Sequence, residues 1–327
     1  MVSKPKLLIL EGKNGPRVTA YCDGPAVNDA FKVTRCGNIV GKPDLIYCQT
    51  YGQRNSFEQL GRWRGPYVLH VGGDIWNERQ ERKAGDTLPE IMRVMWRAQK
   101  VICVSKFLAG IIKDNLGGHD NVVSLPGGLW GTDHTSKGID PSKFNPKTNW
   151  AIKGRPVVVM NINLTVLRKW KGIPLFMTAA YEVFKKHNAI VVCVGKVKGN
   201  RAMSDRWNAV WGLQMVPPSA RWPELLRQAD LYVHPSMFDG FPRSVAEVCC
   251  VGLPALLFNT AGTPEVSESA LLVKPDHTKK IASRLNNLLR SETVRAKVGG
   301  SMRREALDKT IKHRGDYAKM LLDVLEV

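Results

Sequence analysis

Short apolar runs alternate along the chain with longer amphipathic stretches that have the spacing of helices. The apolar and β-branched runs lie at residues 6–10, 45–47, 67–71, 101–104, 122–125, 156–160, 189–195, 231–234, 255–258 and 270–273. Runs of this kind are typical of parallel strands that helices cover on both faces. The pattern therefore predicts an α/β fold of two Rossmann-like, doubly wound domains.

The stretch from Leu129 to Arg155 interrupts this alternation, because it is rich in Gly, Pro, Asn, Ser and Thr and has no apolar periodicity. It reads as a linker. We expect an N-terminal domain over residues 1–150, a second domain over 151–300, and a helical tail over 301–327. The tail carries apolar residues that need a surface to pack on, and we expect that surface on the N-terminal domain: Ile311, Tyr317, Leu321, Leu322 and Leu325.

Composition adds a strongly basic balance, with 48 Lys and Arg against 29 Asp and Glu and a net charge of +19. A hydrophobic content of 43% excludes a disordered chain. The charge favours a polyanion, an anionic membrane surface or a phosphorylated substrate, although a solvated basic surface also fits. Nucleic acid is the less favoured partner, because the basic residues are spread along the chain and do not form one stripe.

The seven cysteines form no CxxC pair, and no histidine pair stands at ligand spacing, so the sequence predicts no metal site and a reducing, cytoplasmic setting. No apolar run reaches 18 residues, and the run at 7–10 is too short for a signal peptide. Basic and aromatic residues mix in one N-terminal stretch, which suits either a peripheral membrane surface or an ordinary exposed helix: Arg54, Phe57, Leu60, Arg62, Trp63 and Arg64.

The segment from Leu231 to Phe258 carries the clearest chemistry. A strand leads into a loop with Asp239, and a helix begins near Pro242, so the loop lies at the carboxyl edge of a sheet, where such folds bind ligands. The N–H groups at the helix start suit a phosphate. Glu247 stands about 12 Å along the helix from Asp239. That span suits two ends of one elongated ligand, although Glu247 could also pair on a helix surface.

This segment resembles the donor-binding signature of glycosyltransferase family 4, whose fold is GT-B, with two Rossmann-like domains facing a cleft. The matching residues are Pro235-Ser236, Asp239-Gly240-Phe241-Pro242, Glu247 and Gly252-Leu253-Pro254. Other segments similar to the family lie at 67–76, 101–108, 121–128, 138–146, 261–266 and 271–275, so the resemblance covers roughly residues 67–327.

The resemblance implies that Glu247 binds the ribose of a nucleotide sugar and that Asp239, where the family usually has Glu, binds the transferred sugar. Lys171 matches the lysine at the donor diphosphate, and Arg168 stands in for an arginine whose position holds Thr165. The remaining donor-binding residues that it implies are Gly240, Phe241, Pro242, Arg243, Ser244 and Gly262.

In the N-terminal half, residues 67–76 resemble a family strand that ends in His-Gly-x-Asp. The match implies an acceptor-side loop at Gly72, Gly73 and Asp74, and a catalytic role for His70. His70 could instead face the core as a hydrogen-bonded strand histidine.

The resemblance to the family implies a retaining hexosyltransferase that uses a UDP- or GDP-linked sugar, and we expect it to work without a metal or cofactor. The acceptor is left open among a lipid-linked molecule, a saccharide and a protein. The alternatives are a nucleic-acid-binding protein, a catalytically silent nucleotide-sugar-binding protein of the same fold, and a GT-B epimerase or phosphorylase.

Overall fold

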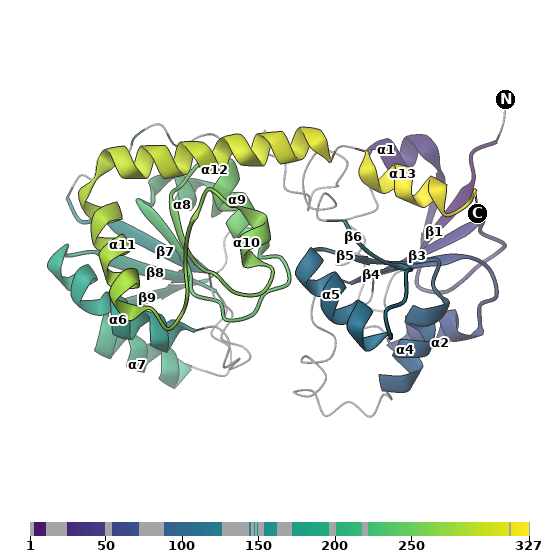
Figure 1. Ribbon diagram of the computed structural model, residues 1–327, viewed down its shortest axis with the longest axis horizontal. Coiled ribbons are helices and arrows are strands. Elements are labelled where there is room, and N and C mark those ends of the chain that lie inside the picture. Colours follow the sequence, from purple (N-terminus) through teal and green to yellow (C-terminus); the bar gives the residue numbers. More distant parts are fainter. Residues whose placement is uncertain are drawn as a thin grey trace. The chain divides into compact units, whose positions relative to one another are not determined.

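The computed structural model describes residues 3–10, 25–49, 54–71, 88–125, 144, 147, 149, 154–161, 172–195, 201–217, 222–313 and 315–326. The chain divides into two compact units (Figure 1). The first holds residues 1–140 and 309–327, and the second holds residues 141–308. The boundary therefore falls after residue 140 and not after residue 150, and the C-terminal part joins the first unit only from Lys309.

The described residues of the first unit form a parallel sheet of strand order β2-β1-β3-β4-β5-β6. Its strands are β1 (Lys6–Leu10), β2 (Lys32–Cys36), β3 (Leu45–Gln49), β4 (Tyr67–Val71), β5 (Lys100–Cys103) and β6 (Val122–Ser124). Its helices are α1 (Pro25–Ala30), α2 (Arg54–Arg62), α4 (Leu88–Arg97), α5 (Lys106–Asn115) and α13 (Asp316–Asp323).

Helix α13 packs on the sheet of the first unit although it comes from the far end of the chain. Tyr317 and Leu321 are buried in one apolar cluster with residues of β1 and β3. Ile311 differs from the expectation, because it is 74% exposed and does not share that packing. Ile311 therefore lies outside this core, and the apolar residues of the tail that pack in it are those after Gly315.

The second unit repeats the architecture with the strand order β12-β11-β10-β7-β8-β9, again parallel throughout the described residues. Its strands are β7 (Val157–Asn161), β8 (Ile190–Val194), β9 (Leu213–Val216), β10 (Leu231–His234), β11 (Ala255–Phe258) and β12 (Leu271–Val273). Its helices are α6 (Ile173–Lys186), α7 (Arg201–Trp211), α8 (Trp222–Gln228), α9 (Arg243–Val251), α10 (Thr263–Val266), α11 (Thr278–Arg290) and α12 (Glu292–Lys312), whose last residues belong to the first unit.

The order of the second sheet places a topological switch point between β7 and β10. The chain runs outward from β7 through β8 to β9 and then returns, so that β10 pairs with the other side of β7. Loops at the carboxyl ends of two such strands diverge and leave a crevice for a ligand. The topology thus predicts that a ligand of this unit lies at the carboxyl ends of β7 and β10.

The proposed peripheral surface on α2 is not supported by the side-chain positions. Phe57 and Leu60 are 6% and 0% exposed, so they belong to the core, while Arg62 and Arg64 are exposed. In the described part of the chain, no helix combines the length and the apolar character that crossing a bilayer requires.

Candidate functional site

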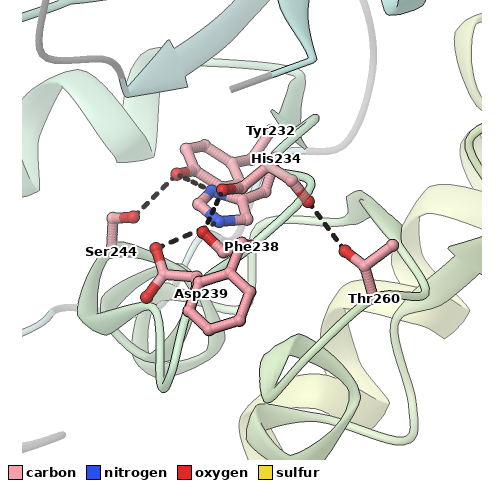
Figure 2. A network of polar contacts seen from close by, with 7 residues as sticks. Tyr232, His234, Phe238, Asp239, Ser244 and Thr260 are labelled. Carbon is pink, nitrogen blue, oxygen red and sulfur yellow. Dashed lines mark hydrogen bonds and ion pairs between the residues drawn. The ribbon is translucent and has the colours of Figure 1, made fainter. Parts of the chain in front are cut away.

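The loop after β10 is held by hydrogen bonds from itself and from the loop after β11 (Figure 2). The hydroxyl of Ser236 donates to the carbonyl oxygen of Phe238 at 3.0 Å, and the hydroxyl of Thr260 donates to the carbonyl oxygen of Ser236 at 2.8 Å. The N–H of Gly262 donates to the carbonyl oxygen of Asp239 at 2.9 Å. These bonds fix the backbone of Asp239 at the carboxyl edge of the sheet.

Helix α9 begins directly after this loop, with the extended residue Pro242 as its N-cap, and no described side chain caps it. A helix start leaves N–H groups without intrahelical partners, and they carry partial positive charge. At this helix they belong to Arg243, Ser244 and their neighbours, close to the switch point. The helix ends at Gly252, whose φ of 74° is the left-handed conformation that glycine favours. The start of α9 is therefore suited to an anion such as a diphosphate.

Two aromatic rings of β10 link the start of α9 to Asp239 (Figure 2). The hydroxyl of Tyr232 donates to the hydroxyl oxygen of Ser244 at 2.9 Å, and its ring stacks on that of His234 with an interplanar angle of 16°. Nε2 of His234 lies 3.7 Å from Oδ2 of Asp239, which forms an ion pair when the imidazole is protonated. Burial raises the pKa of Tyr232, so its phenol keeps its proton. The network thus leads from the start of α9 to the short side chain of Asp239.

Glu247 lies on α9, and its carboxylate is largely removed from water. The indole N–H of Trp222 donates to Oε2 of Glu247 at 2.7 Å. Burial raises the pKa of Glu247, while the charge of Arg243 and the indole hydrogen bond oppose that rise. Burying a carboxylate costs desolvation energy, and such groups are common at functional sites. Glu247 is therefore a candidate for binding a ligand.

We expect Glu247→Gln to be more stable than the wild type at about pH 8. Because the folded state raises the pKa of Glu247, the wild type loses stability as the pH rises through that pKa, and the neutral amide does not. The difference in melting temperature should shrink as the pH falls toward the ordinary value of 4.5. Glu224→Gln, at an exposed position, is the control. A stability difference that does not change with pH would contradict the burial argument.

The structure gathers several predicted donor-binding residues around the start of α9. Gly240, Phe241, Pro242 and Gly262 are buried, so they shape the loops. Lys171, Arg168, Gly72, Gly73 and Asp74 lie outside the described residues. Gly172 is described, and a Cβ at this position would lie 2.2 Å from the carbonyl oxygen of Pro235. The chain that follows Lys171 therefore touches the loop that carries Asp239.

A catalytic side chain must be reachable by the substrate, but His70 is buried inside the first unit. It lies on β4 with no exposed surface. Its Nδ1 is 2.7 Å from the hydroxyl oxygen of Tyr47 and 2.5 Å from that of Tyr317, and its ring stacks on the Tyr317 ring. This placement replaces the catalytic role expected for His70 by a structural one, because the side chain joins α13 to the sheet inside the core.

Three site residues carried no motif in the sequence: Trp222, His234 and Thr260. His234 ended a predicted strand, and Trp222 stands before a proline at a helix start, but neither position by itself indicates a partner. Their importance depends on contacts with residues elsewhere in the chain. Among the described residues, no three His, Cys, Asp or Glu side chains gather as metal ligands would.

Comparison with known proteins finds similarity to glycosyl transferases, strongest in the second unit. Residues 155–291 match the family model of glycosyl transferases group 1. Spore coat protein SA of Bacillus subtilis (strain 168) is 24% identical over 238 residues, which are 64% of this chain and 63% of that protein. The matched segment of the family lies entirely in the second unit and includes Asp239 and Glu247.

Solved structures share the fold of the whole chain. Anabaena Alr3699/HepE in complex with UDP-glucose superposes with a TM-score of 0.71 at 16% identity, over 98% of this chain and 100% of that one. TarM, which is from S. aureus, gives a TM-score of 0.66 at 13% identity, over 86% of this chain. The match spans only 55% of TarM, and spore coat protein SA is also covered over less than two thirds of its length.

The fold class is thereby confirmed. The chain has the two-domain α/β fold of GT-B glycosyltransferases, with two parallel six-stranded sheets in its described residues. Its second unit carries the segment that matches glycosyl transferases group 1.

Proposed function

We propose that the protein is a retaining hexosyltransferase of the family 4 type, which moves a sugar from a UDP- or GDP-linked donor to an acceptor without a metal or other cofactor. The observation that carries this proposal is the start of α9, which no described side chain caps and which lies between Asp239 and Glu247 at the switch point of the second sheet. The resemblance of this segment to the family signature supports it, as does the UDP-glucose complex of Alr3699/HepE.

Each part of the donor has a group that suits it. The Glu247 carboxylate accepts hydrogen bonds from the ribose hydroxyls, and the N–H groups at the start of α9 receive the diphosphate. Asp239 binds the hydroxyls of the sugar, while Lys171 and Arg168 add positive charge at the diphosphate. The second unit is the donor side, and the first unit with Gly72, Gly73 and Asp74 is the acceptor side.

The reaction breaks the bond between the anomeric carbon and the β-phosphate oxygen of the donor. The acceptor hydroxyl oxygen bonds to that carbon from the same face, and its proton passes to the departing diphosphate. Negative charge grows on the diphosphate as the bond breaks, so fixed positive groups around it lower the barrier. The protein's contribution is to place the helix start and the basic side chains at that charge.

The acceptor remains open among a lipid-linked molecule, a saccharide and a protein. The cytoplasmic location and the attachment to an anionic membrane face remain predictions from the sequence. Since the match covers only part of two relatives, an acceptor is not carried over from them.

A thermal-shift screen of UDP- and GDP-linked sugars tests the proposed function. A donor present at 100 times its dissociation constant should add about 2.7 kcal/mol to the free energy of unfolding. The donor that binds is then incubated with and without acceptor saccharides, and the anomeric configuration of the product is determined by NMR. Slow hydrolysis without acceptor argues against a silent binding protein. Binding of none of these donors would overturn the proposal.

Asp239→Ala should separate sugar recognition from nucleotide recognition. We expect the affinity for free UDP or GDP to stay within about twofold, because the ribose and the diphosphate keep their partners. The specificity constant kcat/KM for the sugar nucleotide should fall by at least about a hundredfold, as two hydrogen bonds to a charged group are lost. Calorimetry and steady-state kinetics measure the two effects, with the exposed Asp276→Ala as control. If the variant no longer binds free UDP or GDP, Asp239 contacts the nucleotide and not the sugar, and the proposed orientation of the donor in the site is wrong.

A further inference from the structure

The contact between Trp222 and Glu247 joins two elements that are distant in sequence. Trp222 is the first residue of α8, and Glu247 lies 25 residues later on α9. Among the described residues, the Trp222 indole is the hydrogen-bond donor to the Glu247 carboxylate, at 2.7 Å from Oε2. An indole nitrogen only donates, and a carboxylate only accepts, so the direction of this bond is unambiguous.

Trp222 is itself held in place by its surroundings. Its ring meets that of Tyr232 edge to face, with centroids 6.5 Å apart and an interplanar angle of 75°. Helix α8 is anchored by Leu226, which has no exposed surface. Tyr232 is fixed in turn by its bond to Ser244. The indole N–H therefore has a defined direction before any ligand arrives.

A glutamate on a helix surface has three side-chain torsions, and fixing them costs conformational entropy when a ligand binds. The indole bond fixes the carboxylate in advance and occupies one oxygen. No residue in the described part of the chain donates a hydrogen bond to the other oxygen, Oε1, which leaves its acceptor sites for hydroxyl groups. The same bond also favours the ionised carboxylate against the effect of burial. The fixed orientation and the ionised state both make the Glu247 carboxylate a better acceptor for hydrogen bonds from a ligand.

We propose that Trp222 is a positioning residue of the donor site, which orients the Glu247 carboxylate for the two ribose hydroxyls and so makes the site selective for ribonucleotides. This inference rests on the proposed function of Glu247. The inference adds two things to that function. Trp222 orients the Glu247 carboxylate, and the two residues together distinguish a ribose from a sugar without its hydroxyl groups. Trp222 acts through Glu247 and needs no contact of its own with the ligand.

The test compares UDP and GDP with their 2′,3′-dideoxy counterparts, measured by calorimetry on the full chain. The ratio of the two affinities reports what the ribose hydroxyls contribute. Trp222→Phe keeps an aromatic ring and removes the N–H. We expect it to lower that ratio by about three- to tenfold, as a carboxylate that is no longer held in advance must be ordered on binding. Trp211→Phe is the matched control, because Trp211 is also half-buried in the second unit and packs on its core.

The outcomes separate the inference from the proposed function. If the wild type binds neither UDP nor GDP, the proposed function fails and the inference fails with it. If the wild type discriminates and Trp222→Phe weakens both nucleotides equally, Trp222 only supports the fold, and the inference is overturned while the function stands. Should Trp222→Phe not fold, Trp222→Met, which fills space without a donor, is read in the same way.

Discussion

Replacing Glu247 by alanine is expected to abolish nucleotide binding. The carboxylate would accept two ribose hydroxyls, and hydrogen bonds to a charged group contribute about 1.5–3 kcal/mol each, so their loss corresponds to a reduction in affinity of more than about a hundredfold. The substitution also leaves the indole N–H of Trp222 without its acceptor. Calorimetric titration with UDP and with GDP measures the effect.

The control for this variant is Glu224→Ala, at an exposed position on α8. It removes the same number of charges from the same unit and should leave nucleotide affinity unchanged. Unchanged affinity in Glu247→Ala itself would show that Glu247 only pairs with its neighbours on the helix. The donor-site assignment would then be wrong.

Gly172→Ala is expected to have the largest effect on stability. Gly172 has a φ of 60°, and its added Cβ would lie 2.2 Å from the carbonyl oxygen of Pro235. The left-handed conformation costs a residue with a side chain about 1–2 kcal/mol, and overpacking against backbone adds about 1–3 kcal/mol. We expect the free energy of unfolding to fall by about 2–5 kcal/mol in urea denaturation. Turnover should fall as well, since the preceding residue is Lys171.

Gly212→Ala measures the conformational part of this effect alone, so that the steric part follows from the difference between the two variants. Gly212 has a similar φ of 65° in the same unit, and its Cβ would meet no atom within 4 Å. Its alanine variant should therefore lose only the conformational term, about 1–2 kcal/mol. Equal losses in the two variants would mean that the start of α6 can move away from Pro235.

The alternation of apolar runs predicted most of the fold because a buried parallel strand leaves a strong local signal. All ten predicted strand runs correspond to strands of the structure. Among the described residues, two further strands, β2 and β9, were not predicted, and both lie at sheet edges. An edge strand has one paired neighbour and more exposed positions, as the pattern of β2 shows, so its sequence is less apolar.

The candidate site was predictable where its residues follow one another in sequence. Asp239, Pro242 and Glu247 belong to one strand, loop and helix, whose spacing can be read directly. The partners of these residues were not predictable in this way. Trp222 meets Glu247 only because α8 packs on α9. His70 is a core residue because Tyr317, 247 residues away in the chain, stacks on it and shares a hydrogen bond with it.

The sequence by itself determined the two α/β domains, the order of their strands along the chain, and the short segment with an anion-binding helix start. These features depend on periodicity and on contacts within a few residues. The tertiary structure alone decided that β7 and β10 are neighbours, that Gly172 touches Pro235, and that Trp222 holds Glu247. Such contacts join residues far apart in the chain, and they form only when whole elements pack, so no local pattern encodes them.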